Sequence, residues 1–257
     1  MAEKIIDSTA YRANIRKRKE WGDQNVLWNA PNGTPFEITD SMSSSIWTEG
    51  TFLKDGKLMR GFVYHTVVRD PVGEVKEDLI RECIKWFEKF DYGRGQENQL
   101  PFSDYIGKFW NSVGYDWDGT DTNIPWSAAF ISYVLRIAGG YTGFKFSLRH
   151  SDYIHYAIMS REDERDAPFW GYRLDEIKPK VGDLICLWRG TQVDYEYARR
   201  DDRYTSHCDI IISIKNGKAY TIGGNVGQSV GRKIFALDQN GFFPPSRNAF
   251  AILRNRR

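Results

Sequence analysis

The sequence is poor in cysteine and histidine, and this scarcity excludes several classes of protein. Of 257 residues, three are cysteine and four are histidine. Cys83, Cys186 and Cys208 form neither a CxxC pair nor a zinc-type pattern, so we expect no disulfide framework, no metal and no organic cofactor. The formal net charge of +2 at pH 7 is too small to indicate binding to nucleic acid.

Membrane and export signals are also missing. No apolar run approaches the roughly 18 residues that a membrane-spanning helix needs. The segment Met1 to Asp7 lacks the apolar centre of a signal peptide. We therefore expect no membrane span and synthesis in the cytoplasm. Action at the cell wall or in the periplasm would then require delivery by a secretion system or by phage lysis.

Apolar residues are nevertheless plentiful enough for a core, at 41% hydrophobic and 15% aromatic. The pattern predicts three segments: an N-terminal arm or short helix over residues 1–24, a β-rich region over 25–70, and a larger domain over 71–257. Strand-like pieces in the middle segment alternate with turn signals, and Asp55-Gly56 predicts a hairpin.

The third segment changes from helical to strand-like periodicity along the chain. Apolar spacing predicts helices over 74–90, 103–112, 127–138 and 151–161. Strands are predicted over 181–188, 207–214, 218–222 and 249–253, with a long loop over 189–206. Helices followed by antiparallel strands indicate the α+β class.

Three polar residues stand where a catalytic group would be useful. Ser127 begins a predicted helix, where free backbone N–H groups can stabilise an oxyanion. His207 begins a strand and Asn225 follows the next strand, so the sheet can bring them together. We predict Ser127 as nucleophile, His207 as general base and Asn225 as its orienting partner. Asp209 is an alternative partner, because two residues apart on a strand share one face.

Four ordered motifs carry a resemblance to a known clan. They are Pro125 to Ser132, Val181 to Arg189, Ser206 to Ile210 and Gly223 to Val230. This order resembles the NlpC and CHAP branches of the papain-like hydrolases, which carry cysteine at the nucleophile position. It is more similar to an uncharacterised bacterial family of that clan, in which serine takes that position. The resemblance covers about residues 75–255 and implies a papain-like α+β fold and a cell-wall activity.

A weaker resemblance concerns the β-rich region. Its order of turns, strands and a hairpin is similar to a bacterial SH3-like barrel, the wall-binding module attached to many hydrolases. The alternative is a β-extension of the catalytic domain.

Serine in place of cysteine changes the required chemistry. A thiol has a pKa of about 8.5 and can be ionised by a neighbouring histidine before substrate arrives. A hydroxyl must instead lose its proton during attack, as in the serine-hydrolase triad. Non-catalytic roles are also open: Ser127 as a helix N-cap, His207 as a buried structural histidine, and Asn225 as a turn residue.

Further residues are candidates for contact with substrate. Tyr115 precedes the Ser127 helix in a loop that resembles the tyrosine-rich approach of NlpC-like enzymes, and Trp126 adjoins the serine. His150 begins the next helix, where it either reaches the cleft or caps the helix. Tyr195 and Arg199 lie in the long loop, where aromatic rings suit glycans and guanidinium groups suit carboxylates.

The sequence thus predicts a peptidoglycan hydrolase that cleaves an amide of the wall peptide through Ser127, His207 and Asn225 or Asp209. A catalytically retired module that binds cell wall or a protein partner is the main alternative, and lipid or protein amides are a third class of substrate. Expected partners are peptidoglycan, a component of a secretion apparatus and an immunity protein.

Overall fold

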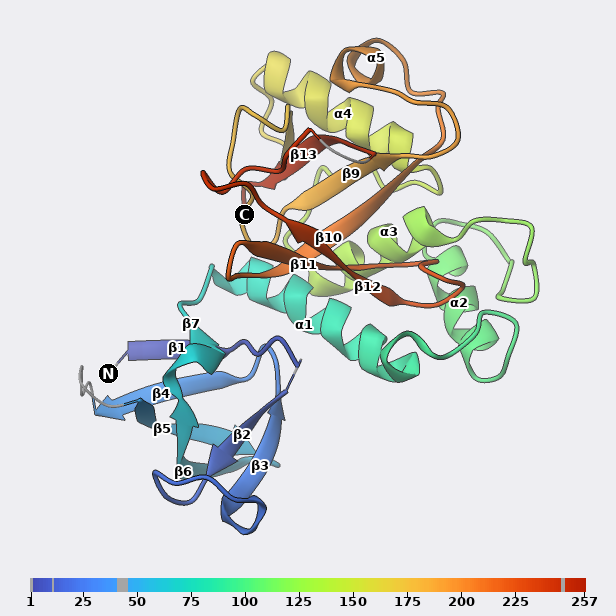
Figure 1. Cartoon of the computed structure of the whole chain (residues 1–257). Coiled ribbons are helices and arrows are strands. Elements are labelled where there is room, and N and C mark those ends of the chain that lie inside the picture. Colours follow the sequence, from blue (N-terminus) through green and yellow to red (C-terminus); the bar gives the residue numbers. More distant parts are fainter. Residues whose placement is uncertain (1, 11, 41–45, 246–247) are drawn as a thin grey trace. The chain divides into compact units, whose positions relative to one another are not determined.

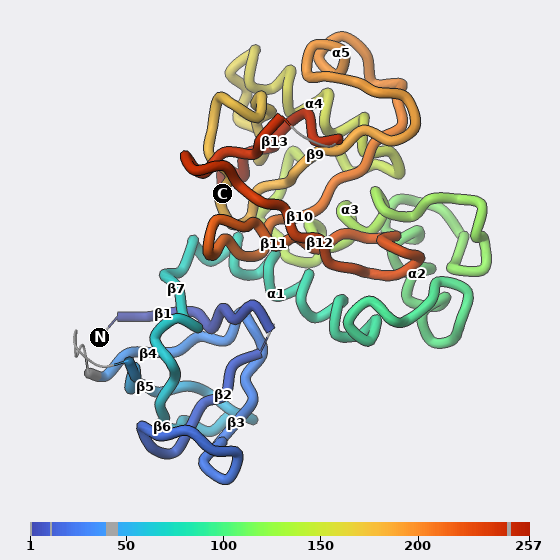
Figure 2. The backbone as a smooth tube through the Cα atoms, in the orientation of Figure 1, coloured from blue at the N-terminus to red at the C-terminus, as the bar shows by residue number. Residues whose placement is uncertain are grey.

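The computed structural model describes residues 2–10, 12–40, 46–245 and 248–257. The chain forms two compact units, Met1–Glu77 and Asp78–Arg257 (Figures 1 and 2). The first unit is built from strands, whereas in the second a series of helices comes before most of the strands. The α+β class predicted from the sequence is therefore confirmed.

The N-terminal unit contains a seven-stranded antiparallel sheet in the order β3-β2-β6-β5-β4-β1-β7. Its strands are β1 (Ala2–Ile6), β2 (Arg12–Arg16), β3 (Val26–Pro31), β4 (Pro35–Asp40), β5 (Trp47–Lys54), β6 (Lys57–Tyr64) and β7 (Val68–Arg69), with short 3-10 turns at Asp23–Asn25 and His65–Val67.

Two of these strands fall where the sequence predicted a helix or arm. β1 and β2 lie within residues 1–20, and the expectation of a helix or arm there was wrong. Ala13 and Ile15 alternate with polar residues along β2 and enter the core, which is the period of a strand. The buried core of this unit consists of Ile6, Ala13, Ile15, Ala30, Phe36, Phe52 and Val63.

Two facing glycines make room for that core. Gly50 of β5 pairs directly with Gly61 of β6. A Cβ atom on Gly50 would lie 2.5 Å from the Phe36 ring, and one on Gly61 would lie 2.6 Å from Ile15. The neighbouring side chains therefore occupy the space above both glycines. The predicted hairpin is confirmed, with Asp55 and Gly56 both at positive φ between β5 and β6.

A buried ion pair joins Arg69, at the end of β7, to Glu77. Glu77 is 3% exposed, and its two carboxylate oxygens accept from Arg69 Nη1 at 2.5 Å and Nη2 at 2.8 Å. The backbone N–H of Val72 donates to the same carboxylate at 2.9 Å. These bonds fix the turn that leads into helix α1 (Glu74–Lys89), inside which the boundary between the units falls.

The C-terminal unit contains a six-stranded antiparallel sheet in the order β12-β11-β10-β9-β13-β8. Helix α3 packs against β10 and β11, and α4 packs against β8 and β10 (Figure 1). After α1 the helices are α2 (Phe102–Asn111), α3 (Ser127–Ala138), α4 (His150–Glu162) and α5 (Tyr195–Arg200), and the strands are β8 (Phe169–Tyr172), β9 (Leu184–Trp188), β10 (Ser206–Lys215), β11 (Lys218–Gly223), β12 (Gly231–Ala236) and β13 (Ala249–Asn255).

The predicted helices are all present, and α3 has the predicted bounds. The predicted loop over 189–206 contains helix α5, which begins after Asp194. The Asp194 carboxylate accepts from the backbone N–H of Tyr197 at 2.7 Å, a helix cap that the loop interpretation overlooked. Strands β8 and β12 were also missed, because they are short and gain their partners from β13 and β11.

Within the described part of the chain, no helix is long and apolar enough to cross a membrane. The described residues likewise include no group of three or more His, Cys, Asp or Glu side chains placed to hold a metal ion. The three cysteines are free and buried. Cys186 and Cys208 are direct partners on β9 and β10, with their sulfur atoms 3.6 Å apart.

Candidate functional site

Ser127 is the first residue of α3, and Trp126 occupies the N-cap position. The Ser127 hydroxyl lies 2.6 Å from His150 Nε2, and the residue is 6% exposed. Its hydroxyl therefore bonds to a histidine on another helix. The N–H of Phe130 makes the first helical bond, to Trp126 O at 3.0 Å. The earlier N–H groups of α3, beside Ser127, thus have no acceptor within the helix.

His150 is the first residue of α4 and is 5% exposed. Its Nδ1 atom is hydrogen-bonded to the hydroxyl of Tyr153, one turn further along the helix. When the ring carries its proton on Nδ1, that atom donates to Tyr153 and Nε2 accepts the Ser127 hydroxyl proton. One chain of hydrogen bonds thus runs from Ser127 through the His150 ring to Tyr153.

Burial lowers the pKa of His150 well below its ordinary value of 6.5. The nearby His207 lowers this pKa further, whereas the Asp209 carboxylate opposes the shift. The N-terminus of α4 acts in the same direction on this pKa, because the positive end of the helix dipole disfavours a charged ring. His150 is therefore neutral at pH 7 and has a free lone pair, as a general base must.

A second buried histidine lies beside the first. His207 of β10 has its Nε2 atom 2.7 Å from Asp209 Oδ1, so the two side chains share one face, as their spacing along the strand predicted. Asp209 is fully buried. Its other oxygen accepts from Lys233 Nζ of β12 at 2.9 Å and from the Thr221 hydroxyl of β11 at 3.3 Å.

His207, Asp209, Thr221 and Lys233 form one group, the Asp209 cluster, and their contacts determine its charges. Burial alone would raise the pKa of Asp209, but His207 and Lys233 outweigh it and hold that pKa below its ordinary value of 3.8. Burial lowers the pKa of His207, although Asp209 opposes the shift. At pH 7 a neutral His207 therefore donates its Nε2–H to an ionised Asp209.

The two histidines belong to one site. Their ring centroids are 5.2 Å apart, and a chain of contacts leads from Ser127 through both rings to Asp209. Two glycines at the end of β11 permit this approach. A Cβ atom on Gly223 would lie 1.9 Å from Asp209 Oδ1, and one on Gly224 would lie 2.5 Å from Phe130 of α3. The absence of side chains thus lets the strand end reach both the Asp209 carboxylate and helix α3.

A cavity of about 240 Å³ opens at the Ser127–His150 bond. Its walls come from Ile124, Pro125 and Ser127, from residues 148–150 and 204–206, and from Trp110 of α2. The residues before β10 thus face the starts of α3 and α4 across one space. Ser127 and His150 therefore both line this space.

The structure does not gather all the residues predicted for the site. Asn225 follows β11 at a φ of 52°, and the described hydrogen bonds include none between its side chain and His207, whose Nε2 is bonded to Asp209. Trp126 is buried below the site, and its indole N–H donates to Glu97 at 2.8 Å.

The other predicted substrate contacts lie around or away from the cavity. Tyr115 stacks on Trp117 at a centroid distance of 4.5 Å, near the cavity residue Trp110. Tyr195 is buried and donates its hydroxyl to the Gly171 carbonyl at 3.1 Å. Arg199 is exposed on α5 and pairs with Glu162. His150, predicted as a substrate contact, is the residue that bonds Ser127.

Sequence reasoning missed Tyr153, Thr221 and Lys233. Tyr153 carried a signal, since it lies one helical turn after His150 and such residues are neighbours. Lys233 carried none, because it meets Asp209 only through β12, which the sequence did not predict.

The fold and site define an α+β protein with a serine–histidine contact between two helix starts. A family model matches residues 81–254, and the chain belongs to that family, described as an uncharacterized protein conserved in bacteria (DUF2272). A solved structure of NlpC2 from Trichomonas vaginalis is similar at 13% identity and a TM-score of 0.31, covering 99% of this chain and 72% of that one. No curated protein matches the chain.

Proposed function

We propose that this protein is a hydrolase that cleaves an amide bond, with Ser127 as nucleophile and His150 as general base. The observation that carries this proposal is the 2.6 Å hydrogen bond between the Ser127 hydroxyl and His150 Nε2, beside a cavity. A hydroxyl needs a base within hydrogen-bond reach, because it cannot ionise at neutral pH alone.

The reaction follows from these contacts. Ser127 Oγ attacks the carbonyl carbon of the substrate as its proton passes to His150 Nε2, while Nδ1–H remains bonded to Tyr153. The tetrahedral oxyanion accepts from the free N–H groups at the start of α3. The C–N bond then breaks, and His150 gives its proton to the leaving amine. Water, deprotonated by the same ring, releases the acid from the ester and restores the Ser127 hydroxyl.

His207 and Asp209 have a supporting role in this mechanism. His150 becomes an imidazolium during the reaction, and burial makes that charge costly. The ionised Asp209 is the nearby charge that favours it. The base role predicted for His207 is therefore assigned to His150, and His207 holds the carboxylate in place.

For the substrate, we favour an amide in the peptide part of peptidoglycan. The support is the ordered set of motifs that resembles the papain-like cell-wall hydrolases, with serine at the cysteine position. In the same proposal the C-terminal unit is a papain-like domain and the β-rich unit is an SH3-like wall-binding module. The protein then acts at the cell wall after delivery by a secretion system or phage lysis, with an immunity protein as a further partner.

One observation favours a second candidate, a binding module without catalysis. Ser127 and His150 are only 6% and 5% exposed, so their hydrogen bond is largely closed to solvent. A site that had lost its activity could keep such a bond for stability alone.

Digestion of purified peptidoglycan, followed by mass spectrometry, separates these functions. We expect fragments from the wild type and from Ser112→Ala, a control at the end of α2, and none from Ser127→Ala. Fragment masses identify the bond. Full activity in Ser127→Ala would refute the nucleophile. If no variant releases fragments and all still sediment with the wall, the binding module is correct.

A further inference from the structure

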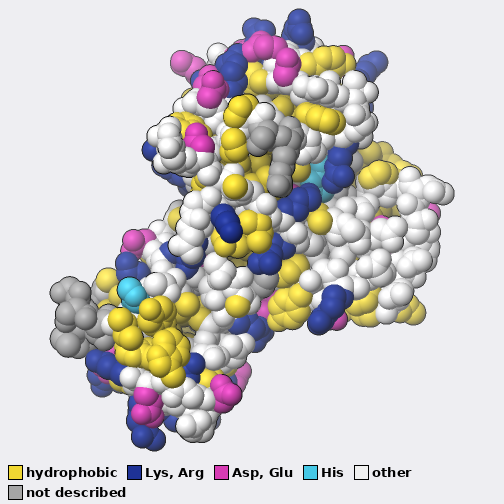
Figure 3. All heavy atoms as spheres, in the orientation of Figure 1, with side chains coloured by type: hydrophobic (Ala, Val, Ile, Leu, Met, Phe, Trp, Pro, Cys, Tyr) yellow, Lys and Arg dark blue, Asp and Glu magenta, His cyan; other side chains and the backbone are white. Residues whose placement is uncertain are grey.

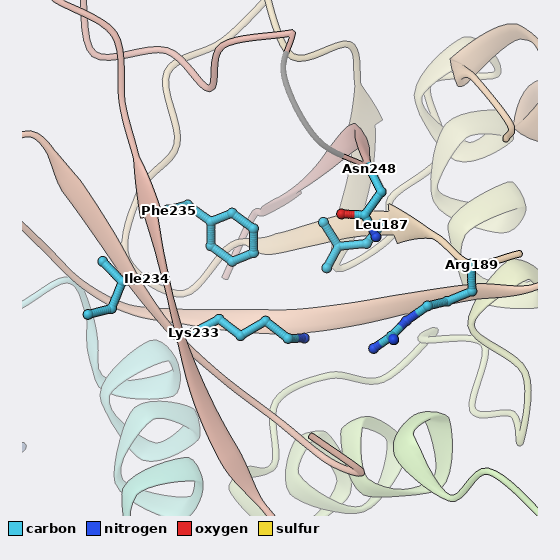
Figure 4. A pocket seen from close by; sticks show the side chains of 6 residues that line it. All are labelled: Leu187, Arg189, Lys233, Ile234, Phe235 and Asn248. Atoms are coloured by element: carbon cyan, nitrogen blue, oxygen red, sulfur yellow. The ribbon is translucent and has the colours of Figure 1, made fainter. Parts of the chain in front are cut away.

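A second cavity of about 370 Å³ borders the Asp209 cluster, because Lys233 both lines the cavity and bonds Asp209. Its polar lining comes from Arg189, which follows β9, from Lys233 of β12, and from Asn248. Its apolar lining consists of Leu187, Ile234 and Phe235. Figure 4 shows Arg189 and Lys233 extending toward each other into the same space, with Leu187 and Phe235 beside them.

The positive charge of this cavity exceeds its negative charge. Lys233 pairs with Asp209, but no carboxylate among the described residues pairs with Arg189. Figure 3 shows further Lys and Arg side chains gathered on the middle of the visible face of this unit. The combination of a free guanidinium, an ammonium and an apolar wall suits a carboxylate that carries a small aliphatic group.

The cavity is connected to the proposed catalytic site by two hydrogen bonds and one ring contact. Lys233 Nζ lies 2.9 Å from Asp209 Oδ2, and Asp209 Oδ1 lies 2.7 Å from His207 Nε2. The His207 ring in turn contacts the His150 ring. A negative charge placed between Arg189 and Lys233 therefore acts on the same network that surrounds the proposed base.

We propose that this cavity is a subsite for a free carboxylate of the peptide substrate, held by Arg189 and Lys233 and coupled through Asp209 to the two histidines. The assignment of the carboxylate to the substrate rests on the proposed hydrolase, whereas its binding does not. The subsite selects peptides that carry a carboxylate at a fixed distance from the cleaved bond.

The electrostatics of the histidines support this coupling. Lys233 and Arg189 both lower the pKa of His150 and of His207, after the larger effect of burial. A bound carboxylate offsets both cations and moves these pKa values upward. His150 then becomes a stronger base only when the correct substrate is in place.

Binding can be measured without catalysis in full-length Ser127→Ala protein labelled with ¹⁵N in its histidine rings. The probe is acetyl-D-alanyl-D-alanine, with its C-terminal amide and inorganic phosphate as comparisons. We expect saturable binding of the acid with a dissociation constant on the order of 1 mM, typical of a small fragment. The ring signals of His207 should move, while those of His65 and His155 serve as internal references.

Two substitutions locate the binding. Arg189→Gln should weaken it at least about fivefold, because it removes a charge-assisted pair of hydrogen bonds. Asn248→Asp should weaken it as well, because it adds a like charge to the polar lining of the cavity. Lys218→Gln, the same loss of charge at an exposed residue of β11 that does not line the cavity, should have no effect.

Each contrary result overturns the proposal. Equal binding of the amide would exclude recognition of the carboxylate, and equal or tighter binding of phosphate would make this a general anion site. Unchanged binding in Arg189→Gln and Asn248→Asp, or no saturable binding, would exclude the cavity. If the acid binds as expected but the wild type cleaves no peptidoglycan, the subsite stands and the hydrolase does not.

Discussion

The two buried histidines of the C-terminal unit are close neighbours with contrasting surroundings. His150 is bonded on both sides by hydroxyl groups, those of Ser127 and Tyr153. His207 is bonded to the carboxylate of Asp209, which an ammonium group also contacts. His150 therefore has uncharged hydrogen-bond partners, whereas His207 has a charged one.

This difference suits the two histidines to two different roles within one site. A base must take up and return a proton, and His150 can do so because its ring is neutral and its Nε2 atom faces the Ser127 hydroxyl. A residue that holds a carboxylate in place needs a fixed charge instead, and Asp209 supplies it. The predictions below test whether the two histidines really differ in this way.

The largest expected difference is in catalysis. His150→Gln should lower kcat/KM for wall peptide by about 1,000-fold, because it removes the general base. His207→Gln should lower it by about 10- to 100-fold, because only electrostatic support is lost. Initial rates of fragment release measure both, with circular dichroism as the control for folding. The reverse order would return the base role to His207.

The next effect is on stability. Asp209→Asn should lower the free energy of unfolding by about 3 kcal/mol, because it breaks a buried ionic network. Lys233→Met introduced on that background should cost less than it costs alone, since the lysine has by then lost its partner. Urea denaturation of the four proteins completes the cycle. Additive costs would show that Asp209 and Lys233 are not coupled.

A third effect depends on pH and is smaller for each histidine per pH unit. Both histidines have lowered pKa values in the folded protein, so below about pH 6.5 the unfolded chain binds protons that the folded chain does not. As the pH is lowered, the free energy of unfolding should therefore decrease by about 1.4 kcal/mol per pH unit for each histidine, until the pH reaches the pKa of that histidine in the folded protein. Asp209 also has a lowered pKa, so below about pH 3.8 the unfolded chain binds a proton that the folded carboxylate does not, and the free energy of unfolding falls further.

Denaturation between pH 7 and 5 tests this dependence. His150→Gln and His207→Gln should each remove about half of the slope. A slope that both variants leave unchanged would mean that the two rings are not kept neutral by burial.

The smallest expected effect concerns the hydroxyl that holds His150. Tyr153→Phe keeps the buried ring but removes the partner of Nδ1, and should cost about 1 kcal/mol of stability. The rate should fall about tenfold, since the tautomer is no longer fixed. A pH–rate profile is the informative measurement, because a packing defect alone would leave its shape unchanged. An unaltered profile would contradict the orienting role.

Local patterns in the sequence were sufficient for much of the fold. The bounds of α3 followed from its apolar period and from the glycines that end it, and the hairpin between β5 and β6 followed from Asp55-Gly56. Strands β1, β2, β8 and β12 were missed, because a short strand is defined by the partner that it meets in the sheet.

The candidate site, like the fold, could be predicted from the sequence only in part. Ser127 could be selected from its position at a helix start, and His207 with Asp209 from their spacing on one strand. The partner of Ser127 could not, because His150 reaches it from a different helix. Only tertiary packing decides which of two nearby imidazoles meets the hydroxyl.

The ion pair between Arg69 and Glu77 determines where the chain can be shortened. A protein that starts at Asp78 would follow the boundary between the units but would lose the first turn of α1. One that starts at Glu74 would keep the helix and leave the Glu77 carboxylate without Arg69. For biochemical work on the C-terminal unit, a starting point before Arg69, or Glu77→Gln in a shorter version, avoids an unpaired charge.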